Sequence, residues 1–230
     1  MKNGLLCLPD YFSDITPSLK KEFESLIINH STSRGMSAEQ DGKVNIGHFS
    51  ISNEGLADSD YVSLVAVNQY LTLLVSYYWG KQVYLAQAGG TRLEPSDIKE
   101  NYRSMQWHHD TKHKQVKIFI LLTDVLQDQQ CTHFITGTHN LWHSSKDHGR
   151  RTNEFIQQLS KPIQLVGKAG TVWVLDTNGY HRGNRNNTVR RDMLVFNYTA
   201  GRYTYPMNFP QKQLKENRFS WLKTNNLKLV

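Results

Sequence analysis

Hydrophobic residues in the first 30 positions recur at steps of three and four, as they do on one face of a helix. The residues that follow this spacing are Phe12, Ile15, Leu19, Phe23, Leu26 and Ile27. A second helix is predicted over residues 60–79, because the polar residues 58–60 can cap its start and Gly80 stands where helices commonly end. The polar stretch 31–41 between these helices is predicted to form a loop.

After Gly80 the pattern changes to short runs rich in β-branched and aromatic residues, separated by turn-forming residues. These runs cover residues 83–87, 116–122, 132–136, 171–175 and 193–199. Many short strands with turns between them are typical of an all-β sandwich or barrel. We therefore expect a single domain over residues 1–230 that is mainly β with flanking helices (α+β). Its parts would be an N-terminal helical part (1–80), a β core (81–200) and a C-terminal tail (201–230).

The composition is that of a globular protein. Of the 230 residues, 38% are hydrophobic and 20% are charged, which is too apolar for a disordered chain. No apolar run approaches the roughly 20 residues of a membrane-spanning helix, and the run 5–8 is too short for a secretory signal. Cys7 and Cys131 are too few for a disulfide framework or a four-cysteine zinc site, so we expect a cytoplasmic protein without a membrane span.

The formal net charge of +7 is concentrated at the C-terminal end. Residues 201–230 hold six basic residues and one acidic residue, so they contribute +5 and leave only +2 for the first 200 residues. A basic tail can bind nucleic acid or anionic lipid, but it is more commonly a solvated surface segment. The small positive charge of the remainder suits an anionic small-molecule substrate.

The stretch Trp-His-His-Asp at 107–110 is the most informative part of the sequence. On a strand, His108 and Asp110 point to one face and His109 to the other. The third ligand of a metal site could be His181, which follows a predicted strand and a turn. Two histidines and one carboxylate leave coordination positions open, as in the facial triad of non-haem Fe(II) oxygenases. A closed structural zinc site would need a fourth protein ligand.

Two arginines, Arg190 and Arg191, follow His181 by nine and ten residues and begin an apolar run. A 2-oxo acid that chelates iron through its keto and carboxylate oxygens leaves a distal carboxylate to be bound. Arginine suits that group through a two-pronged, charge-assisted hydrogen bond. Strand alternation allows only one of the two arginines to face inward.

Four segments together resemble the phytanoyl-CoA dioxygenase family of Fe(II)/2-oxoglutarate oxygenases in order and spacing. They are residues 107–110, 122–139, 170–184 and 190–198. The resemblance covers about residues 105–200 and implies a double-stranded β-helix (jelly-roll, cupin-like) core. Two turns depart from the family pattern: Thr136 precedes Gly137 where a proline is usual, and 129–130 is Gln-Gln where Asn-Gly or a similar pair is usual.

The resemblance also implies roles for individual residues. It places Fe(II) on His108, Asp110 and His181, which are thereby the expected catalytic and metal-binding residues. It places the distal carboxylate of 2-oxoglutarate on Arg191 rather than on the preceding arginine, because the family's arginine begins a strand seven residues before an aromatic position. Lys117 matches a strand position that contacts the co-substrate in some relatives.

From these residues we expect an Fe(II)- and 2-oxoglutarate-dependent dioxygenase that also uses O2 and releases succinate. The substrate would be a small organic molecule, oxidised at a C–H bond. Asp110 is present where halogenating relatives carry a small residue, which favours hydroxylation or a related oxidation. The chain is short for the family and lacks a long insert, so an acyl-CoA substrate is not expected.

Other functions stay open at this point. One is a nucleic-acid- or protein-modifying 2-oxoglutarate oxygenase, although the arginines after His181 do not have the spacing of the nucleic-acid demethylase branch. Another is a non-catalytic, cupin-like binding module. His108 and Asp110 could also be a surface pair, His139 and His143 could bind zinc, and Lys117 could extend to the sheet edge. The sequence does not predict an oligomeric state.

Overall fold

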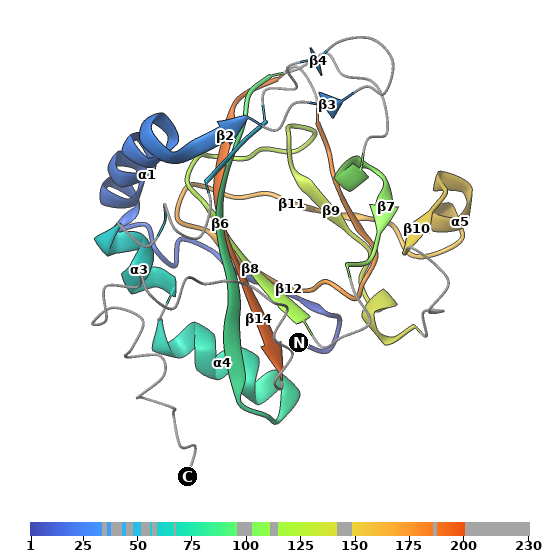
Figure 1. Ribbon diagram of the computed structural model, residues 1–230. Coiled ribbons are helices and arrows are strands. Elements are labelled where there is room, and N and C mark those ends of the chain that lie inside the picture. The colour runs from blue at the N-terminus through green and yellow to red at the C-terminus, as the bar shows by residue number, and fades with distance from the viewer. Residues whose placement is uncertain are drawn as a thin grey trace.

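The computed structural model shows two antiparallel β-sheets that face each other, with helices outside them (Figure 1). It describes residues 1–33, 36–37, 43–44, 48–51, 56, 59–66, 68–95, 103–110, 115–141, 149–185 and 188–200. The predicted basic tail lies outside these residues. The predicted architecture, mainly β with flanking helices, is confirmed.

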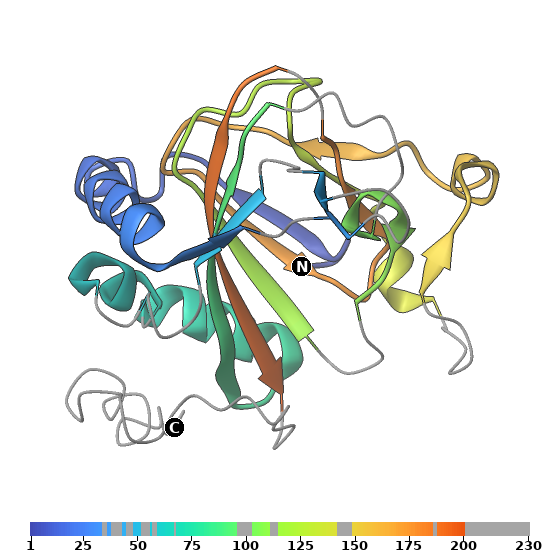
Figure 2. The same cartoon turned by 45° about the horizontal axis from the view of Figure 1, so that its top comes forward.

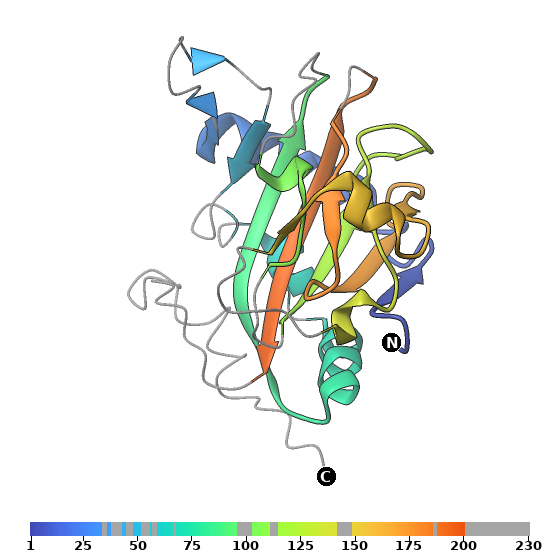
Figure 3. The ribbon, with the colours of Figure 1, turned by 90° about the vertical axis from the view of Figure 1, so that its right-hand side faces the viewer.

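The larger sheet contains the longest strands. Among the described residues its order is β1-β12-β8-β14-β6-β5-β2, with every neighbouring pair antiparallel. The strand bounds are β1 Leu5–Leu8, β2 Ser31–Ser33, β5 His48–Ile51, β6 Val83–Leu93, β8 Gln115–Leu121, β12 Val172–Asp176 and β14 Arg191–Ala200. β6 and β14 pair along their length with one irregularity between Asn197 and Tyr198, and they run side by side in Figure 3.

The smaller sheet is built from short strands in the order β10-β7-β13-β9-β11 among the described residues. Their bounds are β7 Trp107–His108, β9 Thr132–Phe134, β10 Arg150–Arg151, β11 Ile163–Leu165 and β13 His181–Gly183. A two-stranded ribbon joins β3 Met36–Ser37 to β4 Lys43–Val44, and the 3₁₀ turns are η1 Arg103–Met105 and η2 Thr138–Asn140. The two sheets enclose the space in which the functional side chains lie.

Three helices, α1 Thr16–His30, α3 Asp60–Ala66 and α4 Gln69–Trp79, lie on the outer side of the larger sheet (Figure 2). α5 Asn153–Gln157 lies beside the smaller sheet. The face predicted for the N-terminal helix is buried: Leu19 and Phe23 are 0% and 1% exposed. No helix in the part of the chain that the structure describes has the length and hydropathy needed to cross a membrane.

The structure corrects several predicted element boundaries. The predicted helix 60–79 is interrupted, because the Asn68 side chain accepts a hydrogen bond from the backbone N–H of Leu71 and caps a new helix there. Gly80 ends that helix as predicted, with φ of 59°. The predicted loop 31–41 is partly wrong, since β2 and β3 lie within it. β1 was not predicted at all, because a four-residue apolar run has no diagnostic periodicity.

Alternation along the strands of the larger sheet divides its side chains between two apolar clusters. On the helix side, Ile118 and Phe196 pack with α1 and α4 residues. On the inner side, Phe119 and Met193 join a second cluster that reaches Phe134 of the smaller sheet. The larger sheet is therefore packed against apolar residues on both faces.

Two consecutive glycines of β6 face opposite sides of the sheet. A Cβ atom at Gly90 would lie 2.8 Å from Cε2 of Phe23 and 3.0 Å from Cδ1 of Ile51, so only glycine lets α1 pack this close. A Cβ atom at Gly89 would meet no heavy atom nearer than 4.0 Å, the carbonyl oxygen of Val195. Gly90 therefore allows the close packing of α1, and Gly89 leaves open space on the inner face.

We expect Gly90→Ala to lower the free energy of unfolding by about 1–3 kcal/mol, because it overpacks a filled core. Gly89→Ala is the matched control and should leave stability unchanged or raise it by less than about 1 kcal/mol, since alanine loses less backbone entropy. Urea unfolding of both variants measures the difference. Equal destabilisation by the two substitutions would contradict this account of α1 packing.

Candidate metal centre

Neighbouring strands bring His108, Asp110 and His181 together. His181 of β13 lies directly opposite His108 of β7, and Asp110 follows two residues later on the same side. One ligand atom from each residue lies within 4.8 Å of the other two. The Nε2 atoms of both histidines are 3.7 Å from the same carboxylate oxygen, Oδ1 of Asp110. Among the described residues, this is the group of three with metal-binding geometry.

Backbone hydrogen bonds orient both imidazole rings. Nδ1 of His108 lies 2.7 Å from the carbonyl oxygen of Gln106, and Nδ1 of His181 lies 2.9 Å from that of Gly179. Because a carbonyl oxygen can only accept, each Nδ1 must donate, and the other ring nitrogen, Nε2, is the one that faces Asp110. Burial lowers the pKa of His181 to about 4 despite the nearby carboxylate, so this ring is neutral at physiological pH, as a metal ligand must be.

Asp110 is held in its ionised form. Burial raises the pKa of its carboxyl group, but the Lys117 ammonium and the two imidazoles outweigh burial and hold it well below its usual range. Nζ of Lys117 lies 2.6 Å from Oδ2 of Asp110, and Nε2 of Gln115 lies 3.4 Å from the same oxygen. The two carboxylate oxygens therefore have different partners, the imidazoles on one side and the cation on the other.

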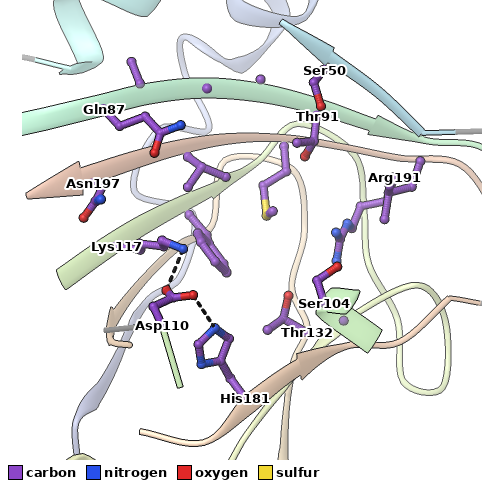
Figure 4. A pocket seen from close by; sticks show the side chains of 18 of the residues that line it. Ser50, Gln87, Thr91, Ser104, Asp110, Lys117, Thr132, His181, Arg191 and Asn197 are labelled. Carbon is purple, nitrogen blue, oxygen red and sulfur yellow. Dashed lines mark ion pairs between the residues drawn. The ribbon is translucent and has the colours of Figure 1, made fainter. Parts of the chain in front are cut away.

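His108, Asp110 and His181 line a cavity of about 510 Å³ between the sheets (Figure 4). Asp110 and His181 face it from below in that view, while β6, β8 and β14 form the opposite wall. Gln87, Asn197 and Lys117 are direct cross-strand neighbours and make a polar row at one end. Arg191 lies at the other end.

Arg191 and Arg190 have opposite environments. Arg191 is 6% exposed, and its Nε and Nη1 atoms are buried without a hydrogen-bond partner within the described residues. Burial lowers its pKa to about 10, so the guanidinium remains charged at neutral pH. The side chain of Arg190 is 45% exposed, and its Nη2 atom lies 3.7 Å from Oε1 of Glu24. Of the two arginines, Arg191 is the one that lines the cavity, in agreement with the alternation argument.

The donor set suits a divalent metal. Two imidazole nitrogens and one carboxylate oxygen converge on one point, and the cavity leaves the opposite side open. Hydrogen bonds from the Nδ1 atoms to carbonyls are the usual means of orienting metal-bound histidines. The buried donors of Arg191 fit a carboxylate at the far end of a chelating ligand.

Other residues singled out in the sequence lie elsewhere. His109 points away from the cavity and lies near Tyr180, with ring centroids 6.0 Å apart and the rings tilted by 60°. His139 lies in η2 against Gly4, and its proposed zinc partner His143 is outside the described residues. Trp107 packs with Tyr180 in a cluster behind the smaller sheet, away from the cavity.

Gln87 and Asn197 of the polar row, and Gln115, were missed by the sequence analysis, whereas Lys117 of that row was among the predicted residues. Asn197 was assigned to an apolar strand, yet it occupies an inward position and its Oδ1 is buried without a partner in the described structure. The available signal was a polar residue at an alternate position of an otherwise apolar strand. The predicted contact between Lys117 and a co-substrate stays a prediction; in the structure its ammonium contacts Asp110.

Comparison with known proteins agrees with this geometry. The profile of a family described as phytanoyl-CoA dioxygenase (PhyH) matches residues 1–192. No curated protein matches the chain in sequence.

Similar solved structures include the non-heme alpha ketoglutarate dependent epimerase SnoN from nogalamycin biosynthesis, with a TM-score of 0.68, 18% identity and coverage of 86% of this chain and 79% of SnoN. EctD from S. alaskensis, solved with bound Fe, has a TM-score of 0.69, 21% identity and coverage of 86% and 73%. HygX from Streptomyces hygroscopicus, solved with nickel, 2-oxoglutarate and hygromycin B, has a TM-score of 0.65, 16% identity and coverage of 88% and 85%. These structures confirm the predicted double-stranded β-helix fold.

We expect the protein to bind one divalent ion, and to be stabilised by about 2.7 kcal/mol when the metal concentration is 100 times its Kd. His181→Gln should abolish the metal-induced rise in Tm, because it removes one ligand. His133→Gln, on the opposite face of the same sheet, should retain the rise. Thermal unfolding with Co²⁺ measures the effect, and a normal rise in His181→Gln would exclude this site.

Proposed function

This chain belongs to the phytanoyl-CoA dioxygenase family, and we propose on that premise that it is an Fe(II)- and 2-oxoglutarate-dependent dioxygenase. It would oxidise a C–H bond of a small organic molecule, by hydroxylation, and convert 2-oxoglutarate to succinate. The observation that carries the proposal is one cavity with three converging ligands at its base and, at its end, the buried donors of Arg191, which have no partner among the described residues.

His108, Asp110 and His181 would hold the iron. When bound, Fe(II) together with 2-oxoglutarate supplies the activation of O2. The protein's contribution is geometric, since the carbonyl contacts of both Nδ1 atoms keep the Nε2 lone pairs directed at the metal position. The cavity leaves the remaining coordination positions accessible to co-substrate and gas.

Arg191 would bind the distal carboxylate of 2-oxoglutarate. Its guanidinium is fixed by burial at the start of β14, and Nε and Nη1 have no competing acceptor within the described residues. A carboxylate arriving there exchanges its water for two charge-assisted hydrogen bonds. Burial also strengthens that interaction by keeping water away.

The substrate would occupy the part of the cavity near Gln87, Gly89 and Asn197. Asn197 and Arg191 lie at opposite ends of the stretch of β14 that lines the cavity, so co-substrate and substrate need not compete (Figure 4). Amide groups and an ammonium at this end suit a polar small molecule. The SnoN and HygX structures, described with nogalamycin RO and hygromycin B, support such a substrate class. Asp110 provides a carboxylate at the ligand position where halogenating relatives carry a small residue, which favours hydroxylation over halogenation.

Purified protein with Fe(II) should release succinate from 2-oxoglutarate, and Asp110→Ala should lose that activity by about 100-fold or more, because a ligand is removed. Asp14→Ala, an exposed aspartate in the N-terminal segment, is the control and should keep it. Succinate formation is the measurement. A fully active Asp110→Ala variant would remove this residue from the mechanism.

Arg191→Gln should raise the KM for 2-oxoglutarate by about 10- to 100-fold, which corresponds to the loss of a charge-assisted hydrogen bond worth about 1.5–3 kcal/mol. Arg190→Gln removes the same group from the neighbouring, half-exposed position and should change KM less than about twofold. Initial rates at varied 2-oxoglutarate concentration measure both. The reverse ranking would assign the carboxylate to Arg190.

A further inference from the structure

We propose that Lys117 is a positioning residue that holds the outer oxygen of Asp110, so that Asp110 offers a metal one oxygen rather than two. This inference rests on the proposed function. Lys117 would thereby preserve a coordination position that a chelating co-substrate or O2 needs.

The two oxygens of Asp110 have separate sets of partners. Oδ1 lies 3.7 Å from Nε2 of each ligand histidine. Oδ2 lies 2.6 Å from Nζ of Lys117 and 3.4 Å from Nε2 of Gln115, which is itself 3.3 Å from Oγ1 of Thr177. A carboxylate held at Oδ2 in this way cannot turn that oxygen toward the histidines without breaking a charge-assisted contact.

The position of Lys117 is itself fixed by the sheet. It lies in β8 between Leu175 of β12 and Asn197 of β14, and its side chain, 22% exposed, faces the cavity. The Asp110 backbone is fixed separately, because its N–H donates to the carbonyl of Thr177 at 3.0 Å. Both ends of the ion pair therefore come from paired backbone, and the contact is not a chance meeting of flexible chains.

Whether Asp110 binds through one oxygen or two decides how many coordination positions stay open, because the protein supplies only three ligand residues. Two histidines and one carboxylate oxygen take three of six positions around an octahedral ion. A 2-oxo acid chelate takes two more, and one is left for O2. Carboxylates can also bind through both oxygens, and a second oxygen from Asp110 would take one of the remaining positions.

Charge makes the role testable. An ammonium beside the ligands repels a divalent cation, so Lys117 does not strengthen metal binding by charge. A positioning role predicts that its removal leaves metal affinity unchanged or higher while chelate binding weakens. A residue needed only for the structure of the site would weaken metal binding when it is lost.

The experiment uses the full-length protein and compares Lys117→Met, Lys117→Arg and the control Lys161→Met, which changes an exposed lysine outside the cavity. Co²⁺ is titrated by calorimetry, and visible absorption of the cobalt complex reports its coordination. 2-Oxoglutarate is then titrated into each Co²⁺-loaded protein.

We expect Lys117→Met to bind Co²⁺ as tightly as the wild type or more tightly, to show an altered cobalt spectrum before co-substrate is added, and to bind 2-oxoglutarate about tenfold more weakly or worse. Lys117→Arg should restore 2-oxoglutarate binding to within about threefold, because it keeps a cation on Oδ2. The control should match the wild type throughout.

Weaker Co²⁺ binding by Lys117→Met with normal 2-oxoglutarate binding would overturn the inference. So would weaker 2-oxoglutarate binding with an unchanged cobalt spectrum, which would mean that Lys117 contacts the co-substrate directly. Failure of the proposed function is separate: the wild type itself would then bind no Co²⁺, or His181→Gln would bind it normally.

Discussion

The site depends on the register of the smaller sheet. β13 lies between β7 and β9, which places His181 directly opposite His108 and puts the two ring centroids 4.4 Å apart. A shift of one residue would turn His181 to the outer face, because strand side chains alternate. The strands themselves are only two or three residues long, so register cannot be enforced by their ladder alone. The apolar residues behind them, among them Trp107 and Tyr180, hold the strands in place from the outside.

The larger sheet forms the other wall of the cavity, which is rigid but changes in chemical character along its length. Its outer face is apolar and covered by helices, and that packing fixes the strands. Its inner face changes along β14 from the Arg191 cation through Met193 and Val195 to the amide of Asn197. Because each position two residues further along the strand faces the same cavity, a single strand arranges cation, apolar surface and amide in a fixed order.

The sequence predicted the architecture and singled out three residues that the structure brings together, because strand-forming runs and the His-x-Asp spacing are local patterns. The meeting of His181 with His108 could not be derived from local pattern alone, since the two are far apart along the chain and the strands that pair them are too short to show periodicity. Arg191 could be preferred to Arg190 only through the resemblance, and its burial distinguishes the two independently. The ion pair between Lys117 and Asp110 was not foreseen, because a lysine in an apolar strand has several possible environments.

The adjacent glycines of β6 have a consequence for how such a protein can change over time. Gly90 is constrained by the ring of Phe23, whereas Gly89 borders open space. Variation at position 89 therefore alters the shape of the chamber while the helix layer stays as it is. Selection for new ligands and selection for folding can act on neighbouring codons without opposing each other.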